Sequence, residues 1–127
     1  MDGQQNQDLV QAVQSIAAAI GTKPDDKYLP VTFTNGWTDF GASHRGAGYM
    51  KDASGFVHVC GLIKSGTIGL AAFTLPVGYR PSATISVAAT SNNLFALLEV
   101  ASNGQVLPQV GSNAYFSLNT LTFKAEQ

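Results

Sequence analysis

The sequence has little charge, a single cysteine and no long apolar run, and each shortage excludes a class of protein. Charged residues make up 12% of the 127 residues, against about 25% in an average domain. With a net charge of −1, the chain has no basic surface for nucleic acid or an anionic membrane. One cysteine excludes an intramolecular disulfide. Because no apolar stretch approaches the roughly 20 residues of a spanning helix and the N-terminus lacks a signal peptide, we expect no membrane insertion and synthesis in a cytoplasm.

The sequence also lacks the common patterns of catalysis. It contains no Gly-x-Ser-x-Gly elbow and no phosphate-binding glycine loop ahead of a helix. His58 and Cys60 share one face of a predicted strand, but a zinc site needs about four ligands, and the other histidine, His44, lies in a separate loop. A glycosidase needs two facing carboxylates, and of the eight acids only Glu99 lies within a predicted strand. We therefore predict a protein that is not an enzyme and that holds no metal or cofactor.

One segment, from Gln4 to Ile20, has the pattern of a helix. Its apolar residues are spaced four, three and four, as in the a and d positions of a heptad repeat. We predict that residues 1–21 form a short helical stem that supports oligomerisation, with an amphipathic helix lying against its own domain as the alternative. Most of these apolar positions carry β-branched residues, which fit a trimer as well as a dimer. The seam residues are Leu9, Val13, Ile16 and Ile20.

Residues 22–30 form a polar linker, and the remainder of the chain, 31–127, has the pattern of one all-β domain. Short alternating runs are separated by turn residues every 8–12 positions, which is typical of an antiparallel sandwich or barrel. We predict strands at 31–34, 49–51, 56–64, 67–74, 83–90, 94–101, 105–110, 114–118 and 121–123.

A stiff connector interrupts this pattern near the middle of the chain. Pro76 and Pro81 each remove a backbone donor, which a central strand does not tolerate. Gly78 permits a backbone angle that other residues resist, and Tyr79 is placed to cover the bend. We therefore predict a structural connector made of Leu75, Pro76, Gly78, Tyr79, Arg80 and Pro81.

The glycine-rich stretch from Trp37 to Gly48 is the longest irregular segment, and a binding loop is expected in such a place. It combines aromatic, acidic and basic residues, a composition suited to saccharides. Two other turns pair asparagine with an aromatic residue. The alternative for Trp37 is that it anchors the junction of stem and head. The candidate receptor-binding residues are Trp37, Asp39, His44 and Arg45, together with Asn92, Asn93 and Tyr115, and Phe40 lies among the first group.

Several motifs, in order, resemble one family. Leu-Pro-Val-Gly-Tyr-Arg-Pro is similar to the Leu-Pro-x-Gly-Tyr-Arg-Pro signature of the C-terminal head domains of bacteriophage tail and fibre proteins, and the resemblance extends over roughly residues 29 to 126. The matching segments are Asn35-Gly36-Trp37-Thr38, Gly48-Tyr49-Met50-Lys51-Asp52, Gly55 to Thr67, Glu99-Val100, Asn103 to Val106 and Leu121 to Glu126.

This resemblance implies a trimeric jelly-roll head on the virion of a phage. We expect a fibre protein that attaches to the host cell surface, with a saccharide as its receptor. The N-terminal segment would then contact other virion proteins, in the capsid or the tail. The alternative is a structural fibre or decoration protein of the capsid that has no strong receptor binding. A fragment of a longer tail protein is a third possibility.

Overall fold

The computed structural model describes residues 27–127, which contain eleven short strands and no helix. The all-β prediction is therefore confirmed for this part of the chain. The predicted stem, with Leu9, Val13, Ile16 and Ile20, lies outside the described residues, as does most of the predicted linker. The strands are β1 (Leu29–Pro30), β2 (Thr38–Asp39), β3 (Gly48–Lys51), β4 (Phe56–Cys60), β5 (Leu62–Lys64), β6 (Phe73–Thr74), β7 (Ile85–Ser91), β8 (Leu94–Val100), β9 (Gln105–Val110), β10 (Phe116–Ser117) and β11 (Thr122–Lys124).

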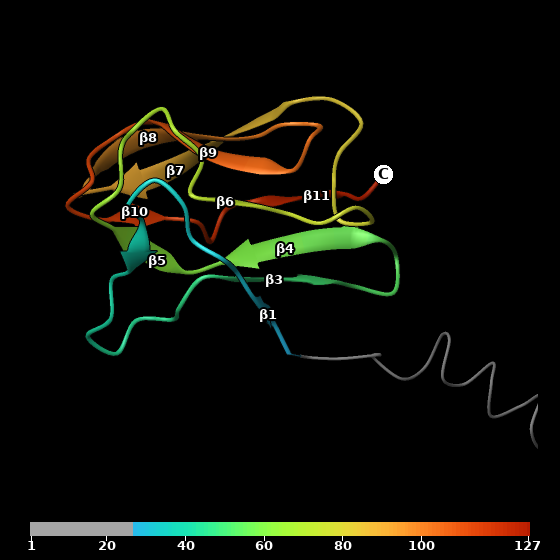
Figure 1. The fold of residues 1–127 in the computed structure, drawn as a ribbon, viewed down its shortest axis with the longest axis horizontal. Coiled ribbons are helices and arrows are strands. Elements are labelled where there is room, and N and C mark those ends of the chain that lie inside the picture. The colour runs from blue at the N-terminus through green and yellow to red at the C-terminus, as the bar shows by residue number, and fades with distance from the viewer. Residues whose placement is uncertain (1–26) are drawn as a thin grey trace, which may run out of the picture.

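The strands form three antiparallel sheets. The first has the order β1-β3-β4-β11, the second β10-β5-β2, and the third β6-β9-β8-β7. Figure 1 shows β7, β8 and β9 in one layer and β3 and β4 in a layer facing it. The second sheet lies at one end, where β10 is in contact with β7. Segments far apart in the sequence therefore meet at that end of the domain.

Gly61 separates β4 from β5, where the sequence predicts one continuous strand over 56–64. Its φ is +122° and a Cβ there would lie 2.6 Å from the Cα of Ala47, so only glycine fits without strain and collision. The backbone changes direction at this point. As a result β4 pairs in the first sheet and β5 in the second.

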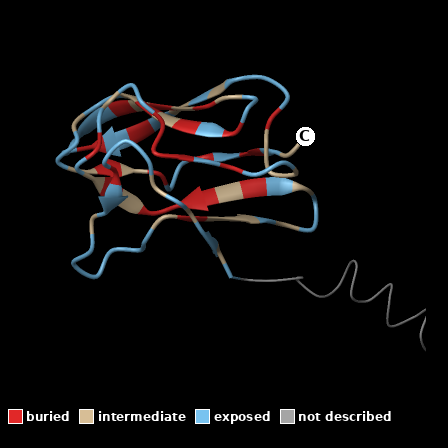
Figure 2. Ribbon diagram, viewed as in Figure 1, coloured by how far each residue is buried: buried red, intermediate tan, exposed pale blue. Residues whose placement is uncertain are grey.

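The core lies between the sheets and takes residues from all three (Figure 2). Its largest side chains are Trp37, Phe73 and Phe116. The first half of the segment 56–64 has one buried and one more exposed face. Val57 on β4 is fully buried, whereas Phe56 is 40% exposed, as expected of a sheet with one face toward water.

The local turn chemistry predicts three turns correctly, and two of them, at 92–93 and 102–104, join paired strands. Asn35-Gly36 and Asn92-Asn93 have positive φ at both central positions, the backbone of a two-residue type I′ turn. The turn at 102–104 places Gly104 at φ +90° and joins β8 to β9. The strand predicted at 83–90 is observed as β7, in which burial alternates along the strand, and β7 pairs with β8 along its full length.

Two predicted strands are wrong. Residues 67–74 are predicted as one strand, but only Phe73–Thr74 form a strand, and that strand pairs with β9 in the third sheet. Positive φ at Ser65 and Gly69 turns the chain away from β5 first. Residues 31–34 form no strand, and β1 lies just before them, inside the expected linker. Val31 and Phe33 do pack against the core, so the alternation there reflects burial rather than pairing.

The residues between β6 and β7 form no strand, and they link the two edge strands of the third sheet. Gly78 has a φ of +99° in a turn that the N–H of Tyr79 closes onto the carbonyl of Pro76, at 3.1 Å. Arg80 donates from Nε to the carbonyl of Leu75 at 2.7 Å, and Pro81 is fully buried. The C-terminus pairs with this segment, since the N–H of Arg80 donates to the carbonyl of Gln127.

Candidate binding cleft

An open cleft of about 440 Å³ lies where the second sheet meets β7. Four segments that are remote in the sequence contribute to it: the loop after β2, strand β5, the β7–β8 hairpin, and the region around β10. The lining residues are Phe40, His44, Arg45, Leu62, Thr90, Asn93, Tyr115, Ser117 and Asn119.

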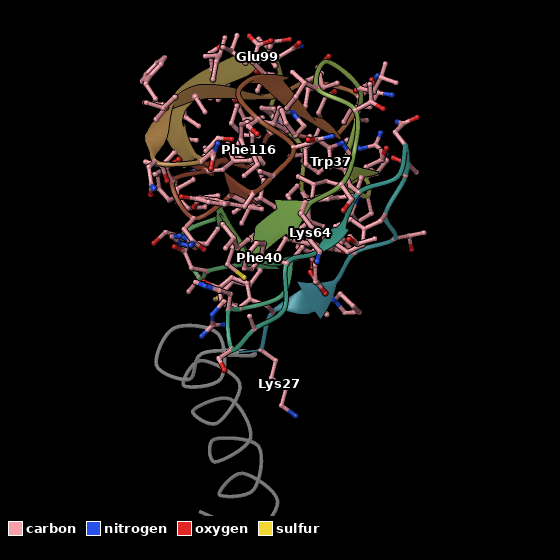
Figure 3. All side chains as sticks on the ribbon, turned by 90° about the vertical axis from the view of Figure 1, so that its left-hand side faces the viewer. Lys27, Trp37, Phe40, Lys64, Glu99 and Phe116 are labelled. Carbon is pink, nitrogen blue, oxygen red and sulfur yellow. The ribbon has the colours of Figure 1, made fainter. Side chains whose placement is uncertain are left out.

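Phe40 is the centre of an aromatic cluster in this cleft. Its ring meets His44 edge to face at 5.3 Å and Tyr115 in the same way at 5.8 Å. The Nζ of Lys64 lies 5.5 Å from the centre of the Phe40 ring. In Figure 3, Phe40 and Lys64 lie between Lys27 on one side and the Trp37–Phe116 pair on the other. The cluster gives the cleft an apolar surface with polar groups around it.

Backbone hydrogen bonds hold the loop that carries Phe40, His44 and Arg45 against β5. The N–H of Phe40 donates to the carbonyl of Leu62 at 2.9 Å, and the N–H of Leu62 donates to the carbonyl of Arg45 at 3.1 Å. Asp39 accepts the N–H of Ala47 through Oδ1 at 2.8 Å. The loop is thus fastened near both of its ends.

Ser91 positions the opposite wall of the cleft. It is the buried polar residue of the described core, and its hydroxyl oxygen accepts the N–H of Ser112 at 2.8 Å. The same hydroxyl lies 2.6 Å from the carbonyl of Tyr115, to which it donates. The phenol of Tyr115 in turn donates to Oδ1 of Asn93 at 2.7 Å. One buried serine therefore couples the β7–β8 hairpin to the aromatic ring of the cleft.

Asn119 closes the third side of the cleft beside the bend at Gly61. Its Oδ1 accepts the N–H of Gly61 at 2.9 Å, and the N–H of Leu118 donates to the carbonyl of Gly61 at 2.8 Å. The segment after β10 thereby provides hydrogen-bond partners for both backbone groups of Gly61, at the bend between β4 and β5. The amide nitrogen of Asn119 is left as a donor.

The structure brings together four of the seven sequence-predicted binding residues: His44, Arg45, Asn93 and Tyr115 line one cleft. Asp39 and Asn92 do not line it. Sequence reasoning missed the remaining lining residues, because strand and turn patterns show no sign of a cavity. The one available signal was the polar pair Asn119-Thr120 between two leucines. The residues missed are Leu62, Thr90, Ser117 and Asn119.

Trp37 belongs to the core and not to the cleft, since it is 1% exposed. Its indole packs edge to face on Phe116 with ring centres 6.4 Å apart. On its other side it lies against Gly66, where a Cβ would come within 2.0 Å of the indole. Within residues 27–127 its Nε1 has no hydrogen-bond partner. The prediction that Trp37 contacts a receptor is therefore corrected: Trp37 is a core residue.

A second polar group lies on the first sheet, away from the cleft. Nε2 of His58 lies 2.8 Å from Oδ2 of Asp52, and Nδ1 lies 3.3 Å from the hydroxyl of Thr122. The hydrogen bond from His58, followed by that from the N–H of Phe56, lowers the pKa of Asp52. Asp52 also accepts the N–H of Ser54, so it caps the β3–β4 turn.

His58 and Cys60 do not form part of a metal centre within the described residues, where no three metal-ligating side chains gather. Burial raises the pKa of the Cys60 thiol, and the nearby charge of Arg45 offsets part of that effect. A thiol held in its protonated form is a poor nucleophile and a poor ligand.

No helix in the described part of the chain could span a membrane.

No protein-family model, no curated protein and no solved structure matches the chain. The geometry of the cleft and the sequence motifs are therefore the observations from which a function can be argued.

Proposed function

We propose that the chain is a phage virion fibre protein whose β-domain attaches to a saccharide on the host cell surface. One observation carries the proposal: His44, Arg45, Asn93 and Tyr115, chosen from the sequence as saccharide-binding candidates, meet in one cleft around Phe40. The resemblance to phage tail and fibre heads supplies the biological setting. The protein acts by binding, without catalysis or a cofactor.

The chemistry of the cleft suits a sugar ring. Pyranose faces carry C–H groups that pack on aromatic rings, and Phe40 and Tyr115 offer such rings side by side. Pyranose edges carry hydroxyls that need polar partners, and Asn93, Ser117 and Asn119 surround the rings. The volume of about 440 Å³ lies in the usual range of ligand pockets, roughly 300–1,000 Å³.

The same proposal includes a trimer with a jelly-roll head. Its support, besides the family resemblance, is the apolar surface near the cleft: Leu94 is 70% and Phe95 71% exposed. Phe95 lies opposite Thr90, a lining residue, in the β7–β8 pair. Exposed apolar side chains of this size are suited to contact with another protein surface. Contact with neighbouring copies would cover them and leave the cleft near the subunit boundary.

The test is binding of the labelled full chain to an array of bacterial cell-wall and capsular saccharides, with Phe40→Ala as the variant. Phe56→Ala is a matched control, because Phe56 also has a lysine over its ring, Lys124 with Nζ 5.4 Å from the ring centre, but lies outside the cleft. Loss of one stacking ring costs about 1.5 kcal/mol, which is about tenfold in affinity.

We expect Phe40→Ala to lose binding and Phe56→Ala to retain it, with both variants folded by circular dichroism. Equal loss in the two variants would reject the cleft as the site. A full chain that binds no saccharide on the array and none on whole cells would favour the structural fibre or decoration protein instead.

A further inference from the structure

We propose that the cleft selects acidic saccharides, and that Arg45 binds their carboxylate or phosphate group. This inference rests on the proposed saccharide function and names its ligand class. The lining contains one permanent cation, Arg45, and no aspartate or glutamate. Lys64 adds a second cation beside the lining, over the Phe40 ring. The chain carries a net charge of −1, yet its cleft is locally positive, which favours an anion.

Arg45 has no acidic partner among residues 27–127. Its guanidinium lies 5.2 Å from the centre of the Tyr28 ring, and its charge acts on the Cys60 thiol. Asp39, the acid of the same loop, uses Oδ1 to accept the N–H of Ala47. A guanidinium presents parallel N–H groups that match a carboxylate or phosphate in pairs. An exposed arginine that lines a formed cleft and has no acidic partner in the described part of the chain is suited to such a ligand.

Two amide side chains of the cleft also offer donors. The Oδ1 of Asn119 is occupied by the N–H of Gly61, and because a backbone N–H can only donate, the free group of this side chain is its NH₂. The Oδ1 of Asn93 is occupied by the phenol of Tyr115, which again leaves an NH₂. Two amides and a guanidinium require a ligand that is rich in acceptors. A carboxylate or phosphate supplies acceptors only, whereas each hydroxyl of a neutral sugar also brings a donor.

Two matched pairs of probes distinguish binding of the acidic group from binding of the sugar ring. Each probe is titrated calorimetrically into the full chain. The first pair is tetragalacturonate and its methyl ester, in which methylation of the carboxyl groups removes their charge and keeps the sugar rings. The second pair is glucose 6-phosphate and glucose. The variants are Arg45→Gln and, as control, Lys51→Gln, since Lys51 Nζ also lies over a ring, 5.0 Å from the centre of Tyr79, outside the cleft.

We expect an acidic probe to bind at least about tenfold more tightly than its neutral partner, since charge-assisted bonds are about twice as strong as neutral ones. Arg45→Gln should lower the affinity for the acidic probe much more than the affinity for its neutral partner and so remove the difference, and Lys51→Gln should alter neither affinity. Whichever acidic probe shows the difference identifies the group as carboxylate or phosphate.

Equal binding of acidic and neutral probes, or an equal effect of Arg45→Gln on both, would overturn the inference while the saccharide function stands. Binding of none of the four probes, combined with no binding on the saccharide array, would overturn both. A preference for the acidic probes that survives in Arg45→Gln would also reject the assigned role of Arg45.

Discussion

The packing of Trp37 on Gly66 can be tested with one added carbon. In Gly66→Ala the new Cβ would lie 2.0 Å from Cδ2, 2.1 Å from Cγ and 2.2 Å from Cε2 of Trp37. Non-bonded carbons need about 3.5 Å, so the indole or the backbone must move by about 1.5 Å. The backbone of Gly66 is itself held, because its carbonyl accepts Nδ2 of Asn113 at 3.0 Å.

The cost of this substitution follows from how little the indole can move. Trp37 is 1% exposed and its far side meets Phe116, so a shift displaces a close-packed core. Overpacking usually costs about 1–3 kcal/mol, and complete loss of a buried tryptophan costs about 3–5 kcal/mol. We expect about 3 kcal/mol, which lowers the Tm of a domain of this size by roughly 12–24 °C.

Urea unfolding measures this directly, because Trp37 is the one tryptophan of the chain and its emission reports both burial and unfolding. Circular dichroism at the same urea concentrations serves as an independent probe of the sheets. The variant should unfold at lower urea, and the native emission of Trp37 should shift to longer wavelength as the indole moves toward water.

Gly69→Ala is the matched control. Gly69 has a φ of +92°, and a Cβ there meets nothing within 4 Å, so this substitution adds backbone strain of about 1–2 kcal/mol without a collision. Gly66→Ala adds the collision without a positive φ. If Gly66→Ala is no less stable than Gly69→Ala, and its Trp37 emission is unchanged, the contact between Trp37 and Gly66 is wrong.

Two further outcomes are expected. The pKa of Asp52 is lower in the folded chain than its value of about 4 in the unfolded chain. The ionised carboxylate therefore stabilises the fold above about pH 4, and this contribution disappears as the pH falls through the folded-state pKa. Asp52→Asn should show a smaller fall in Tm below about pH 4 than the parent, and equal falls would argue against the pair with His58. Gly78→Val should cost about 1–2 kcal/mol in urea unfolding, because its φ is +99° and a Cβ meets nothing within 4 Å; a variant as stable as the parent would show that this turn has been assigned the wrong backbone.

The features that could be predicted from the sequence are those set by a few adjacent residues. Asn35-Gly36 and Asn92-Asn93 adopt positive φ because glycine and asparagine tolerate it, and both form the expected turns. The alternation over 85–91 determines which side of β7 faces the core. These local preferences were sufficient for an all-β fold and for most of its hairpins.

Only the tertiary structure decides which strands pair and which side chains meet. The run 67–74 looks like a partner for 56–64, yet Phe73 pairs with Val106, because positive φ at Ser65 and Gly69 redirects the chain. The residues around Trp37 have the composition of a binding loop, but the side chain of Trp37 packs closely on Gly66 in the core. Neither fact is visible in a local pattern.

The cleft also combines residues that the sequence predicts with an arrangement that only the tertiary structure decides. Sequence reasoning selected His44, Arg45, Asn93 and Tyr115 as polar and aromatic residues in turns, but it could not place them together. Their meeting depends on bonds between remote positions, such as the hydroxyl of Ser91 to the loop at 112–115. Pairings of this kind depend on how sheets stack, which short-range propensity does not encode. The residue types were therefore readable from the chain, and the site they form was decided by the packing of β5, β7 and β10.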